Sequence, residues 1–151
     1  MSSRERQLFL KVSLVKIFKA ARNPSFMNID QTVETIQEAM MLAGIAKEAG
    51  KLEVAIKLAN EVLDSDNSLS NVHGFLGDCY FDTGQYGPAI DRYTDALQRG
   101  ARKEMVLTNL GRCYIMGEMW HMAEETFEKA LREDYSNIYA HTGMGKALVK
   151  R

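Results

Sequence analysis

The side chains with the most chemical potential in this sequence are two cysteines and three histidines. Cys79 and Cys113 could form a disulfide, and His73, His121 and His141 could bind a metal ion or transfer protons. Zinc sites usually place pairs of such ligands about two to five residues apart, and this sequence has no such pair. Phosphate-binding loops and nucleophile motifs are absent as well. We therefore expect no metal site, no cofactor and no catalytic centre.

A repeat with a period of about 34 residues organises most of the chain. Ala55, Ala89 and Ala123 are spaced by this period, and each has Ala or an aromatic residue four positions later. The other positions that keep this period are Leu42-Ala43, Leu76-Gly77, Leu110-Gly111 and Met144-Gly145, the pair Tyr80 and Tyr114, and the series Ala59, Tyr93 and Phe127. Only two prolines interrupt the chain, so the repeating units are expected to be helical.

This pattern resembles the tetratricopeptide repeat family, over residues 36–151. The family's first aromatic residue and final proline are missing, but the period is undisturbed. The resemblance implies an all-α fold, an α-solenoid of antiparallel helix hairpins stacked in a right-handed superhelix. We expect helices at residues 30–49, 53–64, 70–83, 87–98, 104–117, 121–132 and 138–150.

The predicted organisation follows the repeats. It comprises a basic, apolar and helical N-terminal segment (1–29), three repeats (30–69, 70–103 and 104–137) and a closing helix or half repeat (138–151). Gly50 and Gly84 stand where the first helix of a pair must turn, which suits a positive φ. Glu118 takes that place in the third repeat, with Gly117 one residue earlier, so we expect this turn to shift by about one residue.

The N-terminal segment is strongly basic. Residues 1–29 carry six basic side chains and one acidic one, whereas residues 30–99 carry twelve acidic and five basic ones. The segment could pack on the acidic repeats, meet a second protomer in a homo-oligomer, or lie on an anionic surface. Lys11 and Lys16 interrupt its apolar run, and no small-residue cleavage site follows promptly. We therefore expect no secretory signal and a cytoplasmic location.

The repeat also provides a structural interpretation of the cysteines and histidines. Cys79 and Cys113 occupy equivalent positions, which stacked helices place about 9–10 Å apart. A disulfide needs Cα atoms within about 7 Å, so we expect two buried free thiols. His73 and His141 share one repeat position and fill a site that is aromatic in the family.

In the tetratricopeptide family, the first helix of each hairpin lines a concave groove that binds a peptide. The repeat spacing transfers these groove positions to this sequence. The candidate partner-binding residues are Met40, Lys47, Asn71, Asp78, Phe81, Met105, Thr108, Arg112, Ile115, Tyr139, Thr142 and Lys146. Apolar anchors with a few charges suit a mostly apolar peptide. The set of Lys, Asn and Arg with which some family members clamp a terminal carboxylate is not matched here.

The resemblance therefore implies a non-enzymatic protein–protein interaction module, an adaptor or scaffold that binds a peptide or partner protein in the groove. Three alternatives remain open: a self-assembling scaffold that uses residues 1–29, a secretion-type chaperone, and a binder of lipid or RNA through the basic segment. The net charge is only −1, so we expect no nucleic-acid partner. The apolar run from Leu8 to Phe18 has 11 residues, too few to span a bilayer, so we expect no membrane attachment.

Overall fold

A computed structural model describes Arg4 and residues 29–151 of the chain, and these residues contain helices and no strand. The helices are α2 (Ile29–Glu48), α3 (Leu52–Ser65), α4 (Ser70–Asp82), α5 (Tyr86–Gln98), α6 (Lys103–Met116), α7 (Trp120–Glu133) and α8 (Ile138–Lys150). Every end lies within one residue of its predicted place. The predicted all-α class is confirmed, and the predictions for residues 1–28 lie outside the described residues, Arg4 apart.

The chain divides into two compact units, residues 1–58 and 59–151. In the first unit, α2 buries one stripe of small and apolar side chains, including Ala39, Leu42, Ala43 and Ala46. Gly50 follows α2 with a φ of +74° and ends it, as its place in the repeat predicts. Within the described residues, no helix is long and apolar enough to cross a bilayer.

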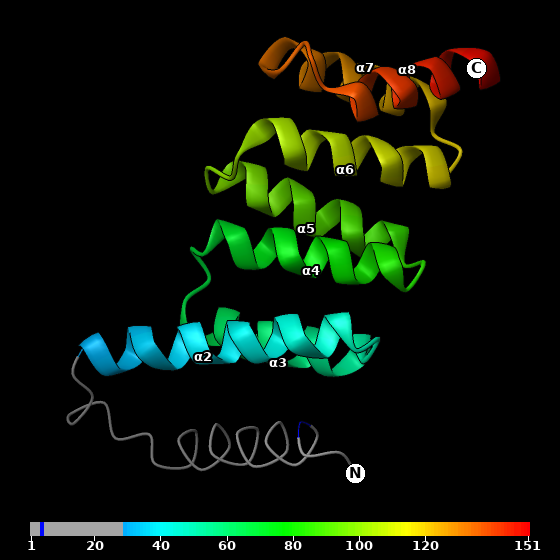
Figure 1. The fold of residues 1–151 in the computed structure, drawn as a ribbon. Coiled ribbons are helices and arrows are strands. Elements are labelled where there is room, and N and C mark those ends of the chain that lie inside the picture. The colour runs from blue at the N-terminus through cyan, green and yellow to red at the C-terminus, as the bar shows by residue number, and fades with distance from the viewer. Residues whose placement is uncertain (1–3, 5–28) are drawn as a thin grey trace. The chain divides into compact units, whose positions relative to one another are not determined.

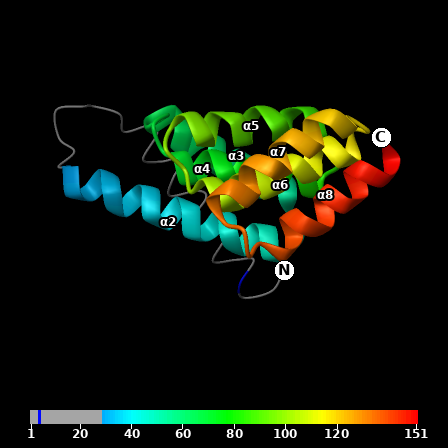
Figure 2. The same cartoon turned by 90° about the horizontal axis from the view of Figure 1, so that it is seen from above.

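The second unit is a stack of helix hairpins. Helix α4 pairs with α5, α6 pairs with α7, and α8 packs against both α6 and α7 (Figures 1 and 2). Its core combines small, aliphatic and aromatic side chains from adjacent helices, with Tyr93 and Phe127 almost completely buried. These rings fill the space that the alanines and glycines leave between helices.

Two glycines on the first helices allow each aromatic ring to approach closely. A Cβ atom added to Gly77 would lie 2.6 Å from the ring of Tyr93, and one added to Gly111 would lie 2.7 Å from the ring of Phe127. Phe127 also contacts Gly143 of α8. The repeated pair of glycine and aromatic residue is therefore the contact that closes each hairpin.

The turns after α4 and α6 have the same conformation, contrary to our expectation of a one-residue shift. Gly84 has a φ of +75° and Glu118 a φ of +58°. The backbone N–H of Gly84 donates a hydrogen bond to the carbonyl of Phe81. The backbone N–H of Glu118 donates to the carbonyl of Ile115, the equivalent residue one repeat later. These hydrogen bonds therefore fix the number of residues in the turn. They place Glu118 in a left-handed backbone conformation that residues other than glycine rarely adopt.

Candidate functional site

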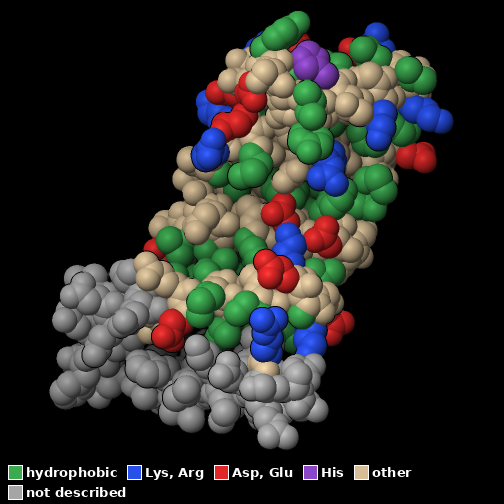
Figure 3. Space-filling model, viewed as in Figure 1, with side chains coloured by type: hydrophobic (Ala, Val, Ile, Leu, Met, Phe, Trp, Pro, Cys, Tyr) green, Lys and Arg blue, Asp and Glu red, His purple; other side chains and the backbone are tan. Residues whose placement is uncertain are grey.

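The predicted binding residues of the second unit lie on the first helices α4, α6 and α8. The exposed residues are Asn71, Met105, Arg112, Tyr139, Thr142 and Lys146, and the half-buried ones are Asp78, Phe81 and Ile115. Met40 and Lys47 are half-buried on α2 in the first unit. Figure 3 shows hydrophobic side chains beside Lys and Arg side chains over α6 and α8.

Asp78 is held in place by neighbours on two other helices. Its Oδ1 accepts a hydrogen bond of 2.5 Å from the hydroxyl of Tyr93 on α5 and one of 3.2 Å from Nδ2 of Asn109 on α6. Burial, followed by the hydrogen bond to Asp78, raises the pKa of Tyr93, so the phenol stays protonated as the donor. Asp78 is thus a positioned acceptor that also connects α4 to α5 and α6.

Phe81 and Arg112 form a cation–π pair beside Asp78. The guanidinium carbon of Arg112 lies 4.6 Å from the centroid of the Phe81 ring, and Nη1 donates 3.3 Å to Oδ1 of Asn109. The ring of Tyr86 meets Phe81 edge-on at 5.5 Å. No carboxylate in the described part of the chain pairs with Arg112, which is exposed. The pair therefore presents a fixed positive charge above an aromatic surface.

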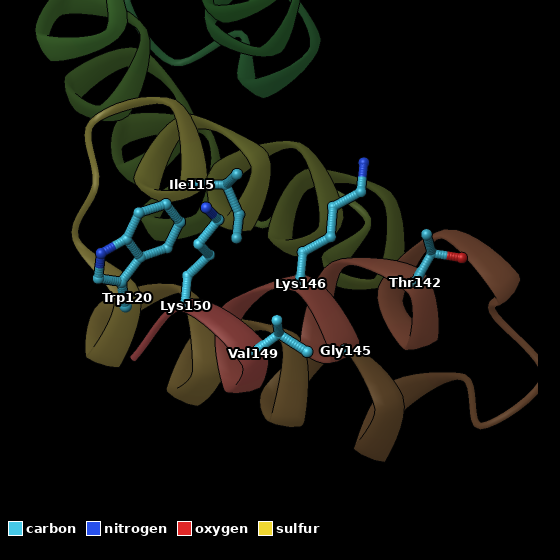
Figure 4. Close-up of a pocket in the computed structure, with 7 residues that line it drawn as sticks. All are labelled: Ile115, Trp120, Thr142, Gly145, Lys146, Val149 and Lys150. Carbon is cyan, nitrogen blue, oxygen red and sulfur yellow. The ribbon is translucent and has the colours of Figure 1, made fainter.

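A pocket of about 620 Å³ lies between α6, α7 and α8 (Figure 4). Its lining residues are Ile115, Trp120, Thr142, Gly145, Lys146, Val149 and Lys150. Trp120, Ile115 and Lys150 meet at one end, while Thr142 lies at the other (Figure 4). Apolar walls beside two lysines can accept a bulky apolar side chain with an acidic neighbour.

The structure brings two groups of the predicted residues together. Asp78, Phe81 and Arg112 form one cluster between α4 and α6. Ile115, Thr142 and Lys146 line the pocket. Asn71, Met105 and Tyr139 are exposed near the starts of the three first helices, outside both groups.

Thr108 is buried, with 6% of its surface exposed, and cannot face a ligand as we had expected. Its hydroxyl donates 2.7 Å to the carbonyl of Glu104 and accepts a hydrogen bond of 2.9 Å from Nδ2 of Asn137. The other side-chain atom of Asn137, Oδ1, caps α8 by accepting from the backbone N–H groups of Tyr139 and Ala140. Thr108 therefore fixes the start of α8.

Sequence reasoning missed four residues of the pocket, namely Trp120, Gly145, Val149 and Lys150. The repeat contains the signal that would have found two of them. Trp120 follows Tyr86 by one repeat period, and Val149 follows Ile115 by the same interval. Because Tyr86 packs against Phe81 in the preceding repeat, its equivalent is expected beside the groove as well.

No family model matches the sequence. Over 75 residues the chain is 29% identical to a protein of Arabidopsis thaliana described as E3 ubiquitin-protein ligase CHIP. That stretch is 50% of this chain and 27% of the plant protein. The match therefore spans about a quarter of the length of this relative.

Solved structures resemble the chain over most of its length. The first TPR domain of Spaghetti (RPAP3), bound to an HSP90 peptide, has a TM-score of 0.72 at 15% identity, covering 77% of this chain and 92% of its own. The Yersinia enterocolitica type III secretion chaperone SycD, with a peptide of the translocator YopD, has a TM-score of 0.72 at 19% identity, covering 78% and 95%. The Sgt2 TPR domain of Aspergillus fumigatus has a TM-score of 0.70 at 15% identity, covering 76% and 78%.

Proposed function

Because the chain has the tetratricopeptide repeat fold, we propose that it is a non-enzymatic interaction module that binds a peptide segment of a partner protein on α4, α6 and α8. The observation that carries this proposal is the pocket whose apolar walls stand beside Lys146 and Lys150. Two of the similar structures hold a peptide, according to their descriptions. That likeness supports the proposal.

The site favours a ligand with an apolar anchor and nearby acidic residues. The anchor would enter between Ile115, Trp120 and Val149, while carboxylates would meet Lys146 and Lys150 of the pocket. A further carboxylate could meet Arg112, which lies over the Phe81 ring. In the described part of the chain, none of these three cations forms an ion pair with a carboxylate. An acidic ligand would therefore form new pairs without displacing existing ones.

The test is a capture experiment with a paired control. The full chain and a Lys146→Ala, Val149→Ser variant would serve as baits. Titration calorimetry would then measure the affinity of each captured peptide for both proteins. Val149 is 83% exposed, so this variant should fold normally. We expect the variant to bind at least about tenfold more weakly, because an anchor contact and an ion pair are lost.

The control variant changes the outer side of a second helix. Met122→Ser with Lys129→Ala alters two exposed residues of α7 outside the pocket. Full binding by this control and loss in the pocket variant would support the proposal. Equal binding by all three baits would overturn it.

Several finer expectations belong to the same proposal. The module would act in the cytoplasm and would need neither a metal nor a cofactor to bind a peptide. An adaptor or scaffold protein would use this binding surface in the same way. A homo-oligomer formed through residues 1–29 stays a prediction, since that segment, Arg4 and Ile29 apart, lies outside the described residues.

A further inference from the structure

A surface between α4 and α6 is the equivalent of the pocket one repeat earlier. We call it the Arg112 platform and define it by Phe81, Tyr86 and Arg112. These positions recur one repeat period later in the lining of the pocket, as Ile115, Trp120 and Lys146. Arg112 is exposed although α7 and α8 follow it in the array, so the platform lies within the stack of hairpins.

The platform differs from the pocket in what it offers a ligand. The guanidinium carbon of Arg112 lies 4.6 Å from the centroid of the Phe81 ring, and the Tyr86 ring meets Phe81 edge-on at 5.5 Å. The chain's own side chains therefore cover apolar surface that is open in the pocket. What remains for a ligand is the positive charge of Arg112 above an aromatic ring.

A series of hydrogen bonds holds this charge in place. Tyr93 donates to Oδ1 of Asp78 at 2.5 Å, and Nδ2 of Asn109 donates to the same oxygen at 3.2 Å. Because the amide nitrogen of Asn109 faces Asp78, its Oδ1 is turned towards Arg112, whose Nη1 donates to it at 3.3 Å. The series connects a buried phenol to an exposed guanidinium, so Arg112 has less freedom to lose when it binds a ligand.

Most of the hydrogen-bonding capacity of Arg112 stays available. A guanidinium carries several N–H donors, and Asn109 accepts from one nitrogen only. In the part of the chain that the structure describes, no other acceptor meets Arg112. The cation–π contact with Phe81 needs no particular N–H group. A carboxylate can therefore accept two hydrogen bonds from Arg112 while the guanidinium stays above the ring.

The distance between platform and pocket limits how a ligand could reach both. Each lies between successive first helices, α4 with α6 and α6 with α8, and these helices contact each other directly. Packed helices are about 8–10 Å apart. A polyproline II segment rises about 3.1 Å per residue with three residues per turn, so residues about three apart face the same side at about 9 Å. A helical ligand would need an interval of about seven residues instead.

The different characters of the two surfaces favour the extended ligand. A helix that docks in a groove uses apolar anchors at intervals of about three, four and seven residues. Here only the pocket offers an apolar place, because at the platform Arg112 covers the ring of Phe81. An extended segment can place one apolar and one acidic residue on the same side without a continuous apolar face.

We propose that the Arg112 platform binds an Asp or Glu side chain of an extended peptide, at an interval of about three residues from the apolar anchor that enters the pocket. This proposal rests on the proposed function, and it adds the conformation of the ligand and the place of its acidic residue. Arg112 contacts the carboxylate directly. Asn109 and Asp78 are positioning residues that act through Arg112.

The probes are synthetic peptides of glycine and serine that contain one leucine as the anchor and one glutamate. The glutamate stands two, three, four or seven residues before or after the leucine, and a matched set has glutamine in its place. Each peptide would be titrated into the isotope-labelled full chain and followed by NMR, which measures weak binding. The methyl groups of Val149 report the pocket, and the side-chain Nε–H of Arg112 reports the platform.

Every leucine peptide should shift the Val149 signals, because every one carries the anchor. The Arg112 signal should shift most with glutamate at an interval of three on one side of the leucine. At that interval, glutamate should bind at least about threefold more tightly than glutamine, as expected of an exposed but pre-positioned ion pair.

The decisive variant is Arg112→Gln, which removes the charge at an exposed position and should fold normally. It should bind the glutamate and glutamine peptides equally and keep the Val149 shifts. Lys129→Gln is the matched control, because it removes one positive charge from an exposed site on α7 outside both surfaces. This control should keep the full preference for glutamate.

Asn109→Ala tests the positioning role. It should reduce the preference for glutamate, and NMR relaxation should show a more mobile Arg112 side chain, because the acceptor of its Nη1 is lost. A loss of stability elsewhere would not increase the mobility of this one side chain. An Arg112 side chain as rigid as in the wild type would overturn the positioning role of Asn109.

The failure of this proposal can be told apart from the failure of the proposed function. Val149 shifts without any preference for glutamate would overturn the platform and leave the pocket as the binding site. A preference that Arg112→Gln retains would overturn it as well, and so would a largest gain at an interval of seven, which indicates a helical ligand. The absence of Val149 shifts with every peptide would contradict both proposals.

Discussion

The hydroxyl of Tyr93 on α5 donates a 2.5 Å hydrogen bond to Oδ1 of Asp78 on α4. The same carboxylate oxygen accepts from Asn109 on α6, so one acidic side chain connects three helices. Asp78 was predicted only as a groove residue. Its two hydrogen bonds give it a second role, which is to hold the hairpins of the second unit in register.

Replacing Tyr93 by phenylalanine should lower the free energy of unfolding by about 1–3 kcal/mol, the usual range for a hydrogen bond to a carboxylate. The ring itself should still fit, because phenylalanine occupies the equivalent position 127. Urea unfolding followed by circular dichroism would measure the change. A double-mutant cycle with Asp78→Ala provides the control, and a coupling energy near zero would show that the bond contributes nothing.

Alanine should have opposite effects at two glycines that share a repeat position. Gly111→Ala should cost about 1–3 kcal/mol, because its Cβ would lie 2.7 Å from the buried Phe127 ring. Gly145→Ala should leave stability unchanged or raise it by up to about 1 kcal/mol, since the space is open and alanine favours helix. Thermal unfolding of both variants checks this, and equal midpoints would contradict the packing described for Phe127.

Most of the fold could be predicted because equivalent positions make the same packing contacts in each repeat. Positions that hold alanine, glycine or an aromatic residue in every unit pack against each other between the two helices of a hairpin. The spacing of these positions therefore predicted the helix bounds and the burial of Phe127. The buried free state of Cys79 and Cys113 followed as well, and it is confirmed. These features depend on local periodicity, which sequence shows directly.

The site was less predictable because it depends on individual partners. Thr108 occupies a groove position by count, but its hydroxyl found Asn137, and spacing alone does not reveal such a pair. The pocket needs Trp120 from a second helix, whereas the prediction considered first helices only. The turn at Glu118 was wrongly expected to shift, because residue preference was weighed above the hydrogen bonds that fix the turn.

That turn leads to a third prediction. Glu118→Gly should raise the free energy of unfolding by about 1 kcal/mol, because glycine adopts a φ of +58° without the steric cost that a side chain incurs. The matched change is Gly84→Ala, which introduces that cost at the equivalent turn and should destabilise by about 1 kcal/mol. Urea midpoints that move in the same direction for both variants would contradict this account.

The two thiols should be unreactive in the folded protein. Cys79 and Cys113 have no exposed surface, and burial raises the pKa of the Cys113 thiol to about 12, so little thiolate forms at neutral pH. A thiol reagent such as DTNB at pH 8 should therefore label neither residue until urea unfolds the chain. Rapid labelling of either cysteine without denaturant would mean that the hairpin interfaces open readily.

The same burial predicts an alkaline loss of stability. An ordinary thiol ionises near 9.0, whereas Cys113 in the folded chain does so at about 12, so the unfolded state releases its proton first. The stabilisation is complete below pH 9 and is lost as the pH rises from 9 towards 12. Tyr93, whose pKa is also raised, adds a loss in the same direction above pH 10. Urea unfolding at a series of pH values should therefore show a falling midpoint, and Cys113→Ala should reduce the slope. A slope that the variant leaves unchanged would assign the loss to other groups.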